Sequence, residues 1–207
     1  MGILSPARQA MRAVHGNMIF SRRVRVLSRA LAQMLPDRAS VLDVGAGSGD
    51  IAIGILSAKP NLTIEGVDVL VRPDAAIAVR EFDGSTLPYP DQTFDYAILV
   101  DVLHHTDDPA HLLGEAARVA HHVIVKDHYR NGLFAATRLR LMDWVGNAHH
   151  GVRLPYNYLS RTEWASLGSS CRLHVTKLSE DLHIYPPPVD WIFGRGLHFV
   201  ATLSNAK

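Results

Sequence analysis

The sequence has a single cysteine, Cys171, so no disulfide can form within it. No stretch approaches the roughly 18–20 uninterrupted apolar residues that a membrane-spanning helix needs. Charged residues interrupt every apolar run of the opening MGILSPARQAMRAVHG, which makes a poor signal peptide. The 21 Lys and Arg nearly balance the 20 Asp and Glu, so no overall charge points to nucleic acid or a membrane. We therefore expect a cytoplasmic protein with no nucleic-acid partner and no integral membrane association.

The sequence instead alternates apolar, strand-like runs with segments of helical periodicity. Strands are predicted at 40–44, 62–67, 77–82, 94–100 and 123–126. Helices are predicted at 7–35, 51–58, 109–120, 133–145 and after Ser160. Two C-terminal runs, 173–182 and 197–203, have no predicted helix between them and indicate an antiparallel pair. The pattern predicts a doubly wound, Rossmann-like α/β sheet, mostly parallel with an antiparallel C-terminal strand pair and helices on both faces.

Three glycines, Gly45, Gly47 and Gly49, follow the first predicted strand in VLDVGAGSGD. In a doubly wound sheet this strand-to-helix turn lies where ligands bind. Glycine lets the backbone turn tightly and brings a ligand against bare amides. Asp68 ends the second strand about 20 residues on, where an acidic residue can bind both ribose hydroxyls. The ligand is therefore expected to contain adenosine or a similar nucleoside.

The spacing of the glycines argues against a dinucleotide. A dinucleotide fingerprint has glycines at its first, third and sixth places, but Asp50 stands at the sixth place and would face a pyrophosphate. No Gly-Lys-Ser/Thr sequence is present, which excludes a phosphate-cradling loop. A ligand with a positive centre and no phosphate suits a turn flanked by Asp43 and Asp50. S-adenosylmethionine is such a ligand.

Three motifs in order, VLDVGAGSGD, GVDV and FDGSTLPYPDQTFDYAILVDVLHH, resemble those of class I S-adenosylmethionine-dependent methyltransferases of the small-molecule type. The resemblance covers residues 40–130. The cofactor-binding residues that it implies are Asp43, Gly45, Ala46, Gly47, Gly49, Asp68, Val69, Asp83, Gly84 and Asp101.

The resemblance also implies a role for each acidic residue. Asp43 would support the glycine turn, Asp68 would hold the ribose and Asp83 would meet the adenine amino group. Asp101, at the end of the fourth strand, would lie near the methionine end of the cofactor. The sequence departs from the family in one respect, because only 15 positions separate Asp68 from Asp83 and leave no room for a full helix. We therefore expect a more open adenine pocket.

His104 and His105 directly follow the strand at whose end the transferable methyl group should point. A histidine there can act as the general base for an acceptor hydroxyl. The alternative is that one histidine packs in the core and the other caps the next turn. His128 and Tyr158 are the reserve candidates for catalysis.

Asp127 and His128 end the fifth strand on the same rim as Asp101. Some metal-dependent O-methyltransferases bind magnesium with carboxylates at these two strand ends, but magnesium prefers oxygen to histidine nitrogen. The adjacent histidine pairs elsewhere lack the spacing of a structural zinc site. No metal is therefore predicted, and Asp127 or His128 is expected to hydrogen-bond the substrate.

The aromatic segment 141–158 and the N-terminal helix are expected to cap the substrate. The alternative is that segment 141–158 is a surface loop whose apolar side chains pack against one another in a small core of their own. Arg22, Arg23 and Arg25 are interpreted as the solvated face of their helix, the alternative being a site for an acidic substrate or a lipid headgroup.

The predicted function is methyl transfer from S-adenosylmethionine to a small, partly apolar acceptor by in-line displacement. The alternatives are an enzyme of the same fold with other chemistry, such as cyclisation or decarboxylation, and a non-catalytic partner subunit. A homodimer is possible. A single domain, 1–207, is expected, with a helical segment 1–39, a cofactor-binding core 40–130, a substrate cap 131–160 and a C-terminal helix with antiparallel strands 161–207.

Overall fold

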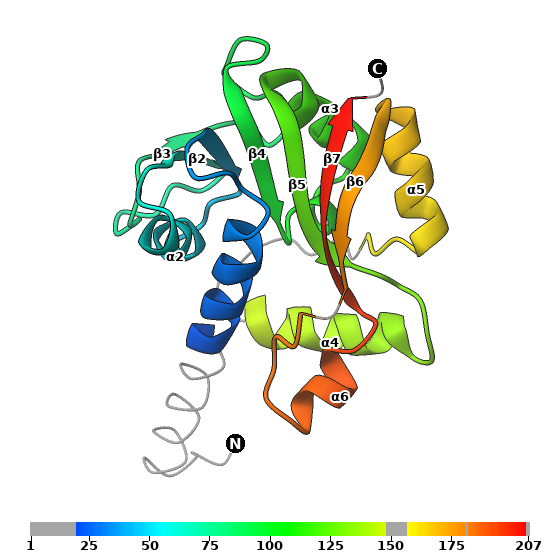
Figure 1. Cartoon of the computed structure of the whole chain (residues 1–207). Helices are drawn as coiled ribbons and strands as arrows, with labels where there is room; N and C mark the ends of the chain where they lie inside the picture. Colours follow the sequence, from blue (N-terminus) through cyan, green and yellow to red (C-terminus); the bar gives the residue numbers. More distant parts are fainter. Residues whose placement is uncertain (1–19, 148–156, 181, 206–207) are drawn as a thin grey trace.

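The computed structural model describes residues 20–147, 157–180 and 182–205, leaving out the side chains of 143–147, and these form a seven-stranded sheet flanked by helices (Figure 1). The strands lie in the order β3-β2-β1-β4-β5-β7-β6. Strands β1 to β5 are parallel, and β7 is antiparallel to both β5 and β6. The predicted sheet, with its antiparallel C-terminal pair, is confirmed. The strands are β1 (Ser40–Val44), β2 (Thr63–Asp68), β3 (Val79–Glu81), β4 (Phe94–Val100), β5 (Ala120–His128), β6 (Leu173–Ser179) and β7 (His198–Asn205).

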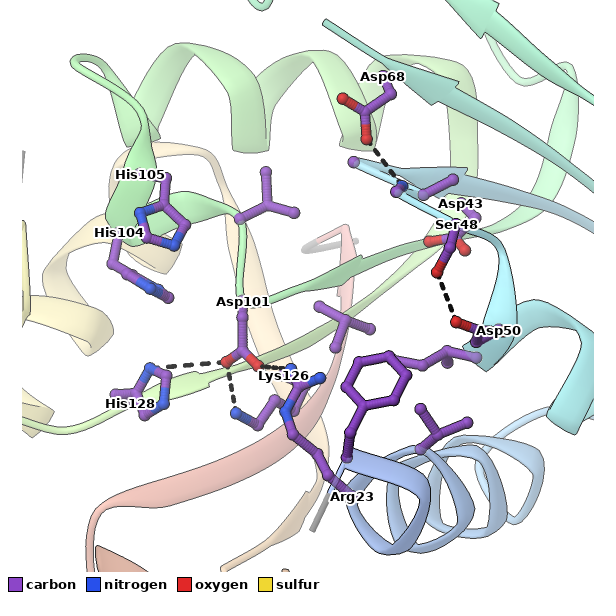
Figure 2. A pocket seen from close by; sticks show the side chains of 18 of the residues that line it. Arg23, Asp43, Ser48, Asp50, Asp68, Asp101, His104, His105, Lys126 and His128 are labelled. Atoms are coloured by element: carbon purple, nitrogen blue, oxygen red, sulfur yellow. Dashed lines mark hydrogen bonds and ion pairs between the residues drawn. The ribbon is translucent and has the colours of Figure 1, made fainter. Parts of the chain in front are cut away.

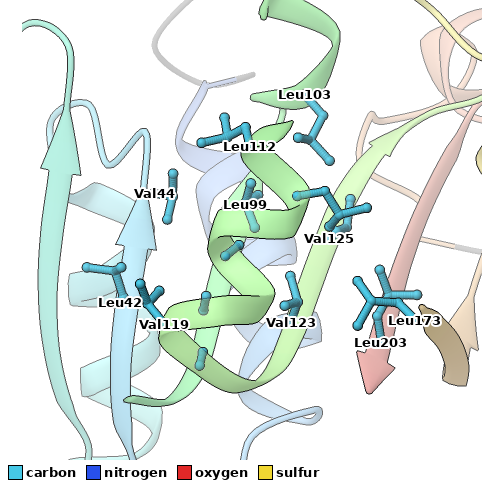
Figure 3. Close-up of a cluster of buried hydrophobic side chains, with 14 of the residues drawn as sticks. Leu42, Val44, Leu99, Leu103, Leu112, Val119, Val123, Val125, Leu173 and Leu203 are labelled. Carbon is cyan, nitrogen blue, oxygen red and sulfur yellow. The ribbon is translucent and has the colours of Figure 1, made fainter. Parts of the chain in front are cut away.

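Alternate side chains of the central strands enter two separate cores, one on each face of the sheet. Leu42 and Leu99 belong to the core beneath α3 (Pro109–Val119) and α5 (Arg161–Ser170) (Figure 3). Ile98, next to Leu99, packs instead in the core beneath α2 (Asp50–Ala58) and the N-terminal helix, residues 20–32. Side chains alternate between the faces of a strand, so a continuous apolar run is buried on both. This explains why FDYAILV and its neighbours predict the sheet correctly.

Local capping signals fix where two of the helices begin. The side chain of Asp108 accepts a hydrogen bond from the His111 amide, and Pro109 opens α3. Ser160 and Glu163 form a reciprocal capping box at the start of α5. Between β2 and β3 the described residues contain no helix, as the short spacing of Asp68 and Asp83 predicts. None of the helices in the described part of the chain is long and apolar enough to cross a membrane.

Two further helices, α4 (Ala135–Asn147) and α6 (Val189–Phe193), lie together at the end of the sheet where the parallel strands finish (Figure 1). Arg138 joins them, because its Nη1 donates to the Ile192 carbonyl oxygen at 2.8 Å. The expectation of no helix between the last two strands is wrong. A single helical turn behind Pro186-Pro187-Pro188 is too short to carry a periodic signal. The predicted N-terminal helix is described only from residue 20, and residues 148–156 of the predicted cap lie outside the described residues.

Leu99 is fully buried at the centre of β4. We expect Leu99→Ala to lower the free energy of unfolding by about 2–5 kcal/mol, because the core cannot collapse fully around the cavity left behind. Urea unfolding of Leu99→Ala measures this change. The matched control is Ile53→Ala on the exposed side of α2, for which we expect a change within roughly 0.5 kcal/mol. Equal losses in the two variants would contradict the assignment of Leu99 to the core.

Candidate functional site

A cavity of about 810 Å³ opens at the carboxyl ends of β1, β2, β4 and β5. This is the edge at which open α/β sheets bind ligands. The glycine turn lines one end of the cavity and His104, His105 and His128 line the other (Figure 2). Residues from the N-terminal helix, α4 and α6 complete its walls.

The glycine turn has a backbone that residues with a Cβ rarely adopt. Gly45, Gly47 and Gly49 all have positive φ, and Gly49, at φ 77°, lies directly before α2. A Cβ on Gly49 would lie 2.9 Å from Cγ1 of Ile77. The Gly45 and Ala46 amides both donate to the carbonyl oxygen of Val67, which ties the turn to β2. Glycine at these positions is therefore a requirement of the turn itself.

Asp68 lies in the cavity wall with its carboxylate held in place by the backbone. The Gly47 amide donates to its Oδ2 at 2.8 Å (Figure 2), and the Leu70 amide donates to its Oδ1 at 3.0 Å. Each carboxylate oxygen can accept a second hydrogen bond, so both remain able to bind hydroxyl groups. Val69 and Gly84 also line the cavity.

Asp43, at the end of β1, is buried beside Asp68. Burial, together with repulsion from Asp68, raises the pKa of Asp43 to about 7. Asp43 can therefore change its protonation state near neutral pH, and a cation bound next to it would favour the carboxylate.

Asp83 is exposed and does not line the cavity. Its Oδ1 accepts hydrogen bonds from the Ser85 and Thr86 amides, both at 2.8 Å, and these lower its pKa. Asp83 therefore shapes the turn that places Gly84 at the cavity wall. A contact from Asp83 to adenine stays a prediction.

The other end of the cavity is built around Asp101, which follows β4 with φ 58°. Arg23 of the N-terminal helix donates to one carboxylate oxygen and Lys126 of β5 donates to the other. Nδ1 of His128 lies 3.6 Å from Asp101 Oδ1 (Figure 2). Burial alone would raise the pKa of Asp101, but the nearby Lys126, His128 and Arg23 hold it well below its usual range. Asp101 is therefore a carboxylate.

Lys126 is fully buried in this cluster, and His198 of β7 supports it. Nε2 of His198 donates to the Phe193 carbonyl oxygen at 2.8 Å, so its Nδ1 accepts from Lys126 at 3.3 Å. Burial, followed by the charge of Lys126, holds the pKa of His198 well below its usual value and keeps the ring neutral.

Asp127 and His104 form a buried carboxylate–imidazole pair, each about 1% exposed, with 2.6 Å between Oδ1 and Nδ1. Burial would raise the pKa of Asp127, but the charge and hydrogen bond of His104 lower it. The His128 amide also donates to Asp127 Oδ1, at 2.8 Å. Asp127 therefore fixes His104 with Nδ1 as the protonated nitrogen.

The structure brings the four predicted catalytic residues together, but at different depths. The rings of His104 and His105 contact each other at an angle of 47°, with centroids 4.0 Å apart, and the His104 ring lies 5.5 Å from the Tyr158 ring. Tyr158 is buried against Leu139 and Leu197 and does not line the cavity. The three histidines thus line the cavity, with His104 buried, while Tyr158 packs behind them.

Donor atoms of Asp101, His104, Asp127 and His128 lie within 4.8 Å of one another, which is close enough to hold a metal ion. However, Lys126 and Arg23 already neutralise Asp101, and Asp127 hydrogen-bonds His104. A divalent cation would have to displace these partners, so the charge balance favours a hydrogen-bonded cluster over a metal centre.

Three residues of the site were not predicted from the sequence or were given another role. Arg23 was assigned to a solvated face, but it contacts Asp101. Lys126 interrupts the apolar run VIVKDH, and such a charge within a buried strand is a signal for a site. His198 carries no such local signal, because its role depends on the pairing of β7 with β5.

Comparison with known proteins shows the family to which this chain belongs. Residues 19–170 match the family described as Methyltransferase domain. The 27-O-demethylrifamycin SV methyltransferase of Amycolatopsis mediterranei is 32% identical over an alignment of 108 residues, and the match covers 45% of this chain and 39% of that protein. The chain therefore spans less than half the length of this relative.

Solved structures agree in fold. A chain in the complex between the Haloferax volcanii Trm112 methyltransferase activator and the putative methyltransferase has a TM-score of 0.68 at 18% identity, covering 99% of this chain and 100% of that one. The Burkholderia thailandensis 1,6-didemethyltoxoflavin-N1-methyltransferase, with bound 1,6-didemethyltoxoflavin and S-adenosylhomocysteine, has a TM-score of 0.62 at 17% identity, covering 100% and 93%. The chain belongs to the family of class I S-adenosylmethionine-dependent methyltransferases.

Proposed function

We propose that this enzyme methylates a hydroxyl group of a small, partly apolar molecule, with His104 as the general base. The observation that carries the proposal is the 2.6 Å pair of Asp127 and His104 in the wall of the cofactor cavity. The name of the relative from Amycolatopsis mediterranei, 27-O-demethylrifamycin SV methyltransferase, indicates methylation of an oxygen, which agrees with a hydroxyl acceptor.

The residues at the glycine end fit the cofactor. The turn presents backbone without side chains, the Asp68 carboxylate is oriented for two hydroxyl groups, and the cavity volume lies within the roughly 300–1,000 Å³ of small-molecule sites. S-adenosylmethionine supplies a methyl group on a positively charged sulfur. Asp68 would bind the ribose, and Asp43 and Asp101 would face the positive groups of the methionine end.

His104 is better placed than its neighbours to take the acceptor proton. With Nδ1 bonded to Asp127, its Nε2 is the nitrogen that can accept a proton, and the carboxylate stabilises the imidazolium that forms. Burial and the charge of Lys126 lower the pKa of His128, which makes it a weaker base than an ordinary histidine. His105 and His128 are therefore assigned to positioning the acceptor.

The rest of the wall indicates an acceptor with apolar surface. Phe20 and Val24 of the N-terminal helix, Leu141 of α4, and Val189 and Phe193 of α6 line the cavity. These side chains would exclude water and align the acceptor, and alignment of this kind contributes about 7–11 kcal/mol to such reactions.

Replacing Asp68 with Ala should weaken S-adenosylmethionine binding by about 1.5–3 kcal/mol, the scale for a lost hydrogen bond to a charged group. Isothermal titration calorimetry measures the change. Asp74→Ala, an exposed carboxylate outside the cavity, is the control and should bind normally. NADH should show no saturable binding to the unmodified protein. An unchanged dissociation constant for Asp68→Ala would end the ribose assignment.

Cofactor affinity should rise as the pH increases from about 6 to 8, by at most tenfold per pH unit, and then level off. The physical reason is the raised pKa of Asp43, about 7, because a cationic ligand binds the carboxylate better than the protonated form. Calorimetry across this range measures the slope. Asp43→Asn should remove the slope, and a slope that persists in this variant would assign it to another group.

Replacing His104 with Ala should lower turnover by about 10²–10⁴-fold, the usual contribution of a general base. Formation of S-adenosylhomocysteine measures turnover on apolar alcohols and phenols, including 27-O-demethylrifamycin SV, with matched amines for comparison. The dissociation constant of S-adenosylhomocysteine should stay unchanged. His174→Ala, on the exposed side of β6, is the control.

Two results would contradict the role of His104. Full turnover in His104→Ala would mean that proton removal occurs elsewhere or is unnecessary, as for a nitrogen or carbon acceptor. Loss of turnover on chelation, with recovery on adding a metal ion, would make His104 a metal ligand instead.

A further inference from the structure

Exposed apolar side chains lie on, or directly beside, three elements that contribute to the cavity wall: the N-terminal helix, α4 and α6. The exposed fraction is 78% for Leu133, 70% for Phe134 and 62% for Trp191. Among the described side chains, every exposed phenylalanine or tryptophan belongs to this group. We call it the mouth face, and its apolar members are Phe20, Leu133, Phe134, Leu141, Trp191 and Ile192. A cluster of this kind marks an interaction surface.

The three elements that form the mouth face are joined to one another and to the cavity. Arg138 of α4 bonds the Ile192 carbonyl oxygen of α6, and Arg22 of the N-terminal helix donates to the His183 carbonyl oxygen at 3.1 Å, before α6. Phe20 and Leu141 both belong to the mouth face and line the cavity. Figure 1 shows the three elements together at one end of the molecule.

Arginines lie on the same three elements as these apolar side chains, although on the N-terminal helix they occupy the face opposite to Phe20. Arg22, Arg25 and Arg29 follow one face of the N-terminal helix, at intervals of three and four residues, away from the buried Leu27 and Leu31. Further arginines of the mouth face are Arg138, Arg140 and Arg195.

The described acidic side chains on these elements do not offset this positive charge. Among the described side chains of 20–32, 133–142 and 182–197, the one acidic residue is Asp190, which is buried and accepts from the Tyr185 amide. The whole chain, with a net charge of +1, is nearly neutral. Among their described side chains, the three elements of the mouth face therefore carry positive charge that acidic residues do not balance.

We propose that the mouth face docks on the surface of a lipid bilayer that contains anionic lipids. Tryptophan, phenylalanine and leucine side chains insert at the boundary between headgroups and acyl chains, and the arginines bind the negative headgroups. The aliphatic Leu133, Leu141 and Ile192 favour a bilayer over a nucleic acid, because they offer no ring for base stacking. In the docked protein the cavity opens toward the bilayer. The enzyme then takes an apolar acceptor directly from the membrane, a consequence that rests on the proposed function.

Flotation of the full chain with vesicles tests the docking without any acceptor. We expect binding to vesicles of phosphatidylcholine with phosphatidylglycerol, weaker binding to phosphatidylcholine alone, and loss of binding at high salt. Arg25→Gln combined with Arg195→Gln should weaken binding by about 30-fold, which corresponds to about 1 kcal/mol for each arginine near the surface. Trp191→Ala should weaken binding by about ten- to hundredfold through the lost apolar insertion.

Matched controls change exposed arginines and an exposed apolar residue that lie outside the mouth face. Arg38→Gln with Arg172→Gln, and Val175→Ala on β6, should bind vesicles as the unmodified protein does. S-adenosylmethionine affinity should be unchanged in all variants, which shows that they are folded, because none of these side chains lines the cavity.

Three results would overturn the proposal. The first is that the protein does not bind the anionic vesicles. The second is that the test and control variants lose vesicle binding equally. The third is that the protein binds single-stranded RNA, and the Arg25 and Trp191 variants lose RNA binding but keep vesicle binding. The vesicle measurement needs no methyl transfer, so a wrong assignment of His104 would leave it unaffected.

Discussion

The ion pairs of Asp101 with Lys126 and Arg23 are the constraint on which the rest of the site depends. They join β4, β5 and the N-terminal helix at one point, and Lys126 is fully buried there. Buried charges are unfavourable unless they are paired and hydrogen-bonded, and removing one partner leaves the other uncompensated. The cluster therefore holds the N-terminal helix over the cavity and fixes the carboxylate that faces it.

The two ends of the cavity differ in the groups that they present. At the glycine end, the backbone of the turn orients Asp68 through the Gly47 amide. At the other end, Asp127 orients His104 through Nδ1. In both places a hydrogen bond fixes the functional group before a ligand arrives, which limits the reorganisation needed for methyl transfer. The parallel sheet brings the two ends together, because all four contributing strands finish at the same edge.

The mouth face extends this arrangement outward. Phe20 and Leu141 both line the cavity and are exposed, so the apolar lining reaches the outside of the molecule at these two residues. In the proposed docking, an apolar acceptor would meet these two side chains as it passes from the membrane into the cavity. The same elements would then serve both docking and exclusion of water.

The sequence by itself determined the features that depend on neighbours along the chain. The apolar runs fixed the strands, Asp108 and Ser160 fixed helix starts, and the glycines with Asp68 indicated the cofactor. Only the tertiary structure decided which charges meet. Arg23 and Asp101 are separated by 78 positions, Lys126 and His198 by 72, and α6 is too short for a periodic pattern. The periodicity of a segment indicates which of its side chains are buried, but not which distant residues they contact. The buried ion pairs and the mouth face could therefore be recognised only from the order of the strands and the placement of the helices.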